Sequence, residues 1–271
     1  MTQAKNSPDE RLLARRPKRY TFRFPKPSGD LTQDEEWCEV HLRDGCFFFN
    51  DTATTEIYTV PALYESLFYR KLKCTSPHRV VSLLRSVLRD VHQSPEQLRV
   101  LDVGAGNGMV GQELRAIGAE HIVGIDIIPE AAIATARDRP GVYDAYHVAD
   151  LTDLDTATDA ELAQDRFNCL TTVAALGFGD IPPLAFMTAY EHIRTGGWLA
   201  FNIKEDSLEG ADDTGFSRFI RGLIDAGAIR MHAYRRYCHR LSVTGDRLFY
   251  VAMIAQKVKQ TPPEVAARVH D

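Results

Sequence analysis

The pattern of apolar and polar positions changes near Leu98. From there, short apolar runs alternate with segments whose apolar residues recur at helical spacing. Gly118 and Gly196 stand where two of these helices should end. This alternation predicts right-handed crossovers and an α/β fold with a twisted, mostly parallel sheet and helices on both faces. The expected strands are Arg99–Val103, His121–Ile127, Ala145–Ala149, Phe167–Ala174 and Trp198–Ile203, and the expected helices lie near Met109–Ile117, Pro129–Arg137 and Leu184–Ile193.

The C-terminal part follows another pattern. Phe216–Ile224 has apolar residues on one helical side, and two strand-like runs follow at Arg230–Val243 and Arg247–Gln256. The junction Thr244–Asp246 carries a glycine between polar residues, as tight hairpin turns do. We therefore expect an antiparallel C-terminal hairpin.

The part before Leu98 is different again. Residues 1–30 combine prolines with charges and predict a disordered or loosely docked arm. Helical spacing over Pro61–Val91 predicts a cap over the sheet, with Ser76 as N-cap and Pro77 at the first helical position. We divide the rest of the chain into an N-terminal section 31–97, an α/β domain 98–260 and a tail 261–271.

One segment does not read as natural protein sequence. Asn50–Thr59 is the literal translation of a common sequencing-adapter oligonucleotide, and Phe47–Phe49 is what a homopolymer tract encodes. We interpret 47–59 as an assembly artefact and assign it no function. The alternative is a polar loop that leads into a strand.

Composition narrows the class of protein. The 271 residues are 44% apolar and 25% charged, as in ordinary globular proteins. We find neither a secretory signal nor an apolar run of the roughly 18 residues that span a bilayer, so we expect a cytoplasmic protein. The 5 cysteines form no C-x-x-C pair, which favours reduced thiols. The net charge of −5 conceals a basic stretch from Arg11 to Lys26, typical of a solvated tail and also suited to binding phosphates.

The strongest chemical signal is the run Val100–Gly108, in which a buried strand is followed by Gly104, Gly106 and Gly108. Glycines let the backbone turn sharply and approach a ligand, and the next helix presents free N–H groups. Gly106, Gly108 and Gly111 also satisfy the G-x-G-x-x-G pattern of dinucleotide sites. The G-x-G-x-G repeat directly after the strand and the C-terminal hairpin favour S-adenosylmethionine instead.

Two acids end the next strands. Asp126 follows the glycine loop by about 20 residues, the spacing that places a carboxylate on an adenosine ribose. Asp150 could accept from the adenine amino group while the N–H of Leu151 faces a ring nitrogen. Asp153 and Asp155 lie nearby, and one of these three acids is expected to be only a helix cap.

Leu101–Leu114, Val123–Ile127, Val148–Leu151, Thr171–Ala175 and Gly196–Lys204 resemble successive motifs of the class I S-adenosylmethionine-dependent methyltransferases. Pro140–Tyr143, Gly177–Asp180 and Gly196–Leu199 further resemble the Williams–Beuren-region methyltransferase-like group and its bacterial relatives. The resemblance implies a Rossmann-like fold, S-adenosyl-L-methionine as cofactor, and Asp102 near its methionine end. The expected cofactor-binding residues are Asp102, Gly104, Ala105, Gly106, Gly108, Asp126, Ile127, Asp150, Leu151 and Val173.

The substrate motifs of this class are incomplete. Asp180–Leu184 differs from the motif of amino-methylating nucleic-acid enzymes by an extra residue and by a leucine in place of an aromatic residue. We find no cytosine-methylating cysteine motif and no pattern of metal ligands, and we expect Gly177–Pro183 to line the acceptor side. Candidate bases or lid groups are His41, Tyr64, Tyr69, Tyr237 and His239, and we expect Tyr64 and Phe68 to cover the cofactor.

We therefore expect methyl transfer to a nucleophile on a small molecule, with nucleic acid an improbable partner and no membrane association. The alternatives are an NAD(P)-dependent oxidoreductase, a protein or nucleic-acid methyltransferase that docks through the basic arm, and a cofactor-binding protein without catalysis.

Overall fold

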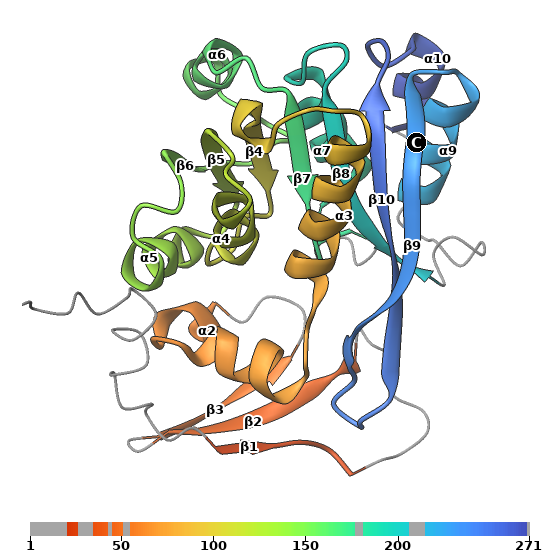
Figure 1. Cartoon of the computed structure of the whole chain (residues 1–271). Helices are drawn as coiled ribbons and strands as arrows, with labels where there is room; N and C mark the ends of the chain where they lie inside the picture. The colour runs from red at the N-terminus through yellow and green to blue at the C-terminus, as the bar shows by residue number, and fades with distance from the viewer. Residues whose placement is uncertain are drawn as a thin grey trace, which may run out of the picture.

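The computed structural model describes residues 21–26, 35–42, 45–50, 55–176, 181–205 and 215–269. Its centre is a seven-stranded sheet of order β6-β5-β4-β7-β8-β10-β9 (Figure 1). Five neighbouring strands run parallel, and β10 is antiparallel to both β8 and β9. This arrangement confirms the predicted fold class. The strands are β4 (Arg99–Val103), β5 (His121–Asp126), β6 (Ala145–Val148), β7 (Cys169–Thr172), β8 (Trp198–Lys204), β9 (Ile229–Leu241) and β10 (Arg247–Lys257).

The strand order indicates where a ligand-binding crevice lies in this sheet. The chain runs outward from β4 through β5 to β6, then returns to add β7 on the other side of β4. The two crossovers leave β4 in opposite directions, and ligands of open α/β sheets bind where that happens, beyond the carboxyl ends of the strands.

Helices cover both faces of the sheet and create two cores. One core contains side chains of α6, α7 and α9, and the other contains side chains of α3 and α4. The bounds are α3 (Ser76–Asp90), α4 (Met109–Ala116), α5 (Pro129–Asp138), α6 (Thr156–Gln164), α7 (Pro183–Glu191) and α9 (Phe216–Asp225).

Three local features differ from the sequence predictions. Thr75, not Ser76, precedes the first residue of α3. The sequence pattern missed α6 because only Leu162 of that helix is buried, and Asp155 caps it by accepting from the N–H groups of Ala157 and Thr158. The predicted tail contains α10 (Pro263–Ala266) and η4 (Ala267–Val269), and Val265 packs against α9.

The N-terminal section contains strands as well as helices. An antiparallel sheet joins β1 (Thr21–Arg23), β2 (Trp37–Leu42) and β3 (Gly45–Asn50). Thr21–Arg23 lie inside the predicted arm, yet Phe22 pairs with Val40. Residues 1–20 lie outside the described part of the chain. The helices α2 (Glu56–Thr59) and η2 (Glu65–Lys71, a π-helix) follow, and their apolar residues form a third core with β2.

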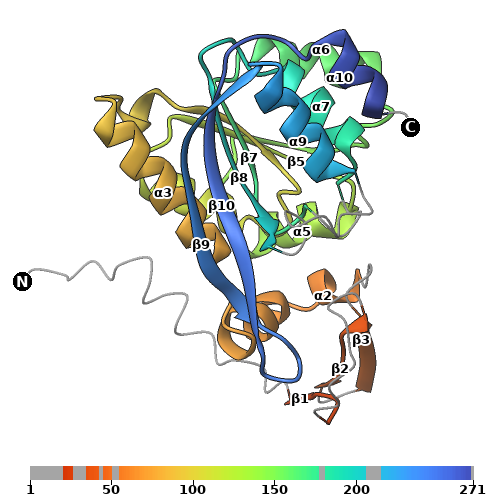
Figure 2. The same ribbon diagram turned by 90° about the vertical axis from the view of Figure 1, so that its right-hand side faces the viewer.

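The β9–β10 hairpin extends past the main sheet to this N-terminal section (Figures 1 and 2). Thr75 donates to the carbonyl of His239 at 2.9 Å, and Leu241 donates to the carbonyl of Leu72 at 2.6 Å. Arg240 and Glu36, both nearly fully buried, form an ion pair of 2.6 Å. The hairpin thus brings residues from the far end of the chain beside the crevice. No helix in the described ranges is both long and apolar enough to cross a membrane.

Candidate active site

The loop between β4 and α4 forms the floor of the crevice. Gly104, Gly106 and Gly108 have φ angles of 67°, 53° and 85°, which side chains rarely tolerate. A Cβ on Gly104 would lie 3.0 Å from Ile181 and 3.1 Å from Ala175. The backbone here is therefore bare because both its conformation and its neighbours require it.

Asp126, at the end of β5, holds this loop. Its Oδ2 accepts from the Gly106 N–H at 2.8 Å, and its Oδ1 accepts from the Ile128 N–H at 3.0 Å. Burial raises the pKa of Asp126, and the two backbone donors oppose that shift. Each carboxylate oxygen can accept a further hydrogen bond, so the side chain can hold the loop and still bind hydroxyl groups.

Asp102 lies beneath the glycine loop. It is completely buried and does not line the cavity. Its Oδ1 accepts from the Thr171 hydroxyl and its Oδ2 from the Tyr143 hydroxyl, both at 2.6 Å. Desolvation raises the pKa of Asp102 to about 7. Asp102 therefore supports the glycine loop from below, and its expected part in holding the cofactor's methionine end stays a prediction.

Gly108 and Gly111 are also explained by packing. Neither lines the cavity. A Cβ on Gly108 would lie 3.1 Å from Val142, and one on Gly111 would lie 2.7 Å from the ring of Tyr143. Gly108 is therefore required by packing, and its expected contact with the cofactor stays a prediction.

A cavity of about 670 Å³ runs along the carboxyl ends of β4, β5 and β7. Asp150 lies at its rim, exposed, and accepts from the backbone N–H and the hydroxyl of Thr152 at 2.8 and 2.7 Å. These bonds lower the pKa of Asp150. The expected residues that line the cavity are Gly104, Ala105, Gly106, Asp126, Ile127, Asp150, Leu151 and Val173.

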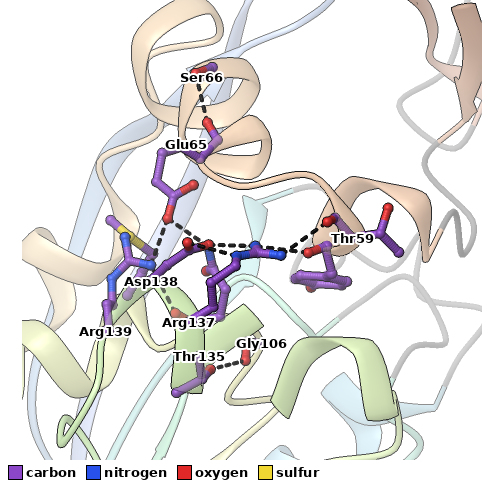
Figure 3. A network of polar contacts seen from close by, with 12 residues as sticks. Thr59, Glu65, Ser66, Gly106, Thr135, Arg137, Asp138 and Arg139 are labelled. Atoms are coloured by element: carbon purple, nitrogen blue, oxygen red, sulfur yellow. Dashed lines mark hydrogen bonds and ion pairs between the residues drawn. The ribbon is translucent and has the colours of Figure 1, made fainter. Parts of the chain in front are cut away.

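A charged tie, formed by Glu65, Asn107 and Arg139, joins the cap to the glycine loop. Glu65 of η2 accepts from Arg139 Nη1 at 2.6 Å and from Asn107 Nδ2 at 2.9 Å (Figure 3). Arg139 also donates to the Asn107 carbonyl at 2.9 Å. Arg137 donates to the carbonyls of Tyr58 and Thr59, so α5 also contacts α2. Sequence patterns gave no sign of this tie, because its members come from three separate segments.

The other end of the cavity is lined by aromatic and apolar side chains. Of the candidate bases and lid groups, Tyr64, Phe68, Tyr69 and His239 line it. His41 bonds to Glu39 on β2 and does not line it. Tyr237 is buried against Ser76 and Asn202. Ile181 and Pro182 line the wall as expected for the acceptor side, whereas 177–180 lie outside the described residues.

Protonation at this end is set by burial. Desolvation raises the pKa values of the Tyr69 hydroxyl and the Cys74 thiol. Desolvation, followed by the nearby Arg240 charge, lowers the pKa of His239 well below its usual value. At neutral pH these groups are therefore uncharged.

The described residues fit S-adenosylmethionine. Gly104 and Gly106 form a cradle that a Cβ would fill, and an acid closes the next strand. The carboxyl ends of β4 and β5 thus offer bare backbone and a carboxylate, which an adenosine with its ribose hydroxyls requires.

Comparison with known proteins agrees with this geometry. The chain matches the family described as "Methyltransferase domain" over residues 76–236. A comparison with curated proteins gives no significant match.

Among solved structures, the chain is similar to magnesium protoporphyrin IX methyltransferase from Synechocystis PCC 6803 with bound SAH, at 13% identity, 67% and 82% coverage of the two chains and a TM-score of 0.49. It is similar to a putative RNA methyltransferase from Pyrococcus horikoshii, at 13% identity, 67% and 83% coverage and a TM-score of 0.48. It is also similar to the N-methyltransferase NodS from Bradyrhizobium japonicum WM9, at 15% identity, 66% and 86% coverage and a TM-score of 0.46.

The family match spans more than half of the chain, from the first residue of α3 into β9. It includes the glycine loop, Asp126 and the strands that carry them. The chain therefore belongs to the methyltransferase domain family and is a class I, S-adenosylmethionine-dependent methyltransferase.

Proposed function

We propose that this enzyme transfers the methyl group of S-adenosylmethionine to a nucleophile on a small molecule held in the aromatic end of the cavity. The observation that carries the proposal is the continuity of one cavity from Asp150 to Tyr250. Its volume of about 670 Å³ lies within the range of about 300–1,000 Å³ typical of small-molecule sites. The cap residues Tyr64 and Phe68 line this cavity, which favours a compact acceptor over a folded macromolecule.

The cofactor roles follow from the same geometry. In our proposal the bare backbone at Gly104 and Gly106 contacts the amino-acid end of the cofactor, and Asp126 accepts from both ribose hydroxyls. Asp150 and the N–H of Leu151 bind the adenine at the rim. Ile127, which is 59% exposed, covers one side of the base.

Methyl transfer from a sulfonium needs little from protein side chains. In-line positioning and exclusion of water supply most of the rate, and a base is required only when the acceptor must lose a proton. A cavity end of largely aromatic side chains suits this chemistry, because it positions the acceptor and keeps water out, and the charge of Arg240 in its lining is paired with Glu36.

We also infer kinship with the Williams–Beuren-region group from Pro140–Tyr143 and Gly196–Leu199. In this chain Tyr143 links the first of these stretches to Asp102 beneath the glycine loop.

Fractionated acceptors test the substrate class. The full chain would be incubated with methyl-labelled S-adenosylmethionine and either the small-molecule or the macromolecular fraction of a cell extract. We expect label in the small-molecule fraction, and no loss of that activity when residues 1–20, with most of the basic stretch, are removed. Label in protein or nucleic acid that disappears with the deletion would overturn the proposal.

A further inference from the structure

His239 is a deeply buried polar group at the aromatic end of the cavity, next to Arg240. Its side chain lies on β9, the residue is 4% exposed, and its ring lies 4.1 Å from that of Tyr250. Nδ1 lies 2.5 Å from the Ser76 hydroxyl. The Cys74 thiol also lies 3.9 Å from Nδ1, so both polar contacts of this cavity-lining imidazole are made at Nδ1, and no hydrogen bond reaches Nε2 from the residues that the structure describes.

The proton position on this imidazole can be derived from a buried chain of hydrogen bonds. The chain begins at Ala174, whose N–H donates to Asn202 Oδ1 at 2.7 Å. A backbone N–H can only donate, so it fixes the orientation of the Asn202 amide. Asn202 Nδ2 therefore faces the Tyr237 hydroxyl, at 2.7 Å, and donates to it.

The direction of each later bond follows. The Tyr237 hydroxyl already accepts from Asn202, so its own proton goes to the Ser76 oxygen at 2.6 Å. The Ser76 proton then goes to His239 Nδ1, which must be an acceptor. A neutral imidazole that accepts at Nδ1 carries its proton on Nε2.

Ala174, where this chain of hydrogen bonds begins, is a strained position on the cavity wall. Ala174 has a φ of 62°, unusual for a residue with a side chain, and it lines the cavity. Such strain persists where surrounding contacts hold it and occurs preferentially at functional sites. The network thus fixes both a backbone segment and an imidazole at one end of the cavity.

We propose that His239 donates a hydrogen bond from Nε2 to a carbonyl or carboxylate oxygen of the methyl acceptor, and so selects and positions that acceptor. The inference rests on the proposed small-molecule function. His239 does not act as a base, because Nε2 has no lone pair to offer. If these hydrogen bonds ran in the opposite direction, the Tyr237 hydroxyl would have to donate to the Asn202 NH2 group, which cannot accept a hydrogen bond.

The proton position is tested without any acceptor. Long-range proton–nitrogen NMR of histidine-labelled full chain should show a protonated Nε2 and an unprotonated Nδ1 for His239, unchanged at neutral and mildly alkaline pH. Ser76→Ala removes the hydroxyl that fixes the tautomer, so a mixed population is expected there. A protonated Nδ1 in the unsubstituted chain would overturn the proposal.

The donor role is tested with benzoate as an aromatic carboxylate probe, in the presence of saturating S-adenosylhomocysteine. Benzoate should shift the His239 Nε2 proton saturably, whereas benzylamine, whose ammonium group cannot accept, should not. His239→Leu should weaken benzoate binding about 10- to 150-fold, as expected for one hydrogen bond to a charged group, and His239→Gln should restore part of it. No benzoate response, or an equal response to benzylamine, would overturn the proposal.

Calorimetry with S-adenosylhomocysteine on the same samples separates the two proposals. Suppose that the fractionation experiment gives no label in small molecules while the chain still binds S-adenosylhomocysteine and His239 Nε2 is protonated. That result would count against the small-molecule function alone. A normal small-molecule methylation with His239→Leu at unchanged acceptor KM would count against His239 alone.

Discussion

The Tyr143 hydroxyl donates a 2.6 Å hydrogen bond to Asp102, and the Tyr143 ring fills the space that a side chain at Gly111 would need. The carboxylate and the ring lie beneath the loop that carries Gly104 and Gly106. The most recognisable motif of the chain therefore has two layers. The backbone at Gly104 and Gly106 faces the cavity, whereas Asp102 and Tyr143 shape the loop from below.

Asp102→Asn should change how stability depends on pH. Burial raises the pKa of Asp102 from 3.8 to about 7 in the folded chain, so between these values the folded state binds more protons than the unfolded state. This contribution to stability is complete below pH 3.8 and is lost as pH rises through about 7. The asparagine does not titrate. The free energy of unfolding of the variant, relative to the original chain, should therefore rise between about pH 5 and 7 and level off above about 8.

Urea unfolding of both chains over that pH range measures the difference. A difference that is independent of pH, or that falls as pH rises, would show that Asp102 is already charged in the folded state.

Gly111→Ala should destabilise the fold by about 1–3 kcal/mol, because the new Cβ would lie 2.7 Å from a ring held by Asp102. Gly222→Ala is the matched control. It gains the same helix propensity in α9, and its Cβ would meet only Val265, at 3.3 Å. Thermal or urea unfolding compares the two variants. If Gly111→Ala proved as stable as Gly222→Ala, the packing role of Gly111 would be refuted.

Glu65→Ala should loosen the cap. It leaves Arg139 and Asn107 without a shared partner, and hydrogen bonds to charged groups contribute about 1.5–3 kcal/mol. We expect faster proteolysis within the cap and weaker binding of S-adenosylhomocysteine. Glu113→Ala, which removes a surface contact with His78, serves as the control. Equal proteolysis of the two variants would mean that Glu65 does not hold the cap.

The segment 47–59 gives a prediction about the gene. Resequencing from the source organism should return a different sequence between Cys46 and Val60. Ile57 and Tyr58 line the cavity, so the corrected residues would complete the cap. Recovery of the same sequence would make this stretch native and the adapter likeness a coincidence.

The sequence predicted the sheet well because its information is local. The bounds of β4 match the prediction, and α4 begins at Met109 as expected. Asp126 and Asp150 line the cavity as expected, since strand ends of a parallel sheet meet at one edge.

Contacts between distant segments could not be predicted in this way. Asp102 was assigned to the cofactor by the family resemblance, and the sequence did not reveal its partners Tyr143 and Thr171, which are 41 and 69 positions away. The neutral environment of His239 depends on Ser76, 163 positions earlier. Short-range patterns carry no information on such pairs, so the support of the loop and the chemistry of the acceptor end required the structure.

The central claim is that the cofactor is bound at the carboxyl ends of β4 and β5, with its amino-acid end on the bare backbone at Gly104 and Gly106 and its ribose on the carboxylate of Asp126. Calorimetric titration of S-adenosylhomocysteine into the Asp126→Ala chain, beside the original chain and an Asp153→Ala control, tests it most directly. Loss of one charged hydrogen-bonding group should weaken binding by about 1.5–3 kcal/mol, roughly 10- to 150-fold, in Asp126→Ala alone. Equal affinity in all three chains would contradict the account.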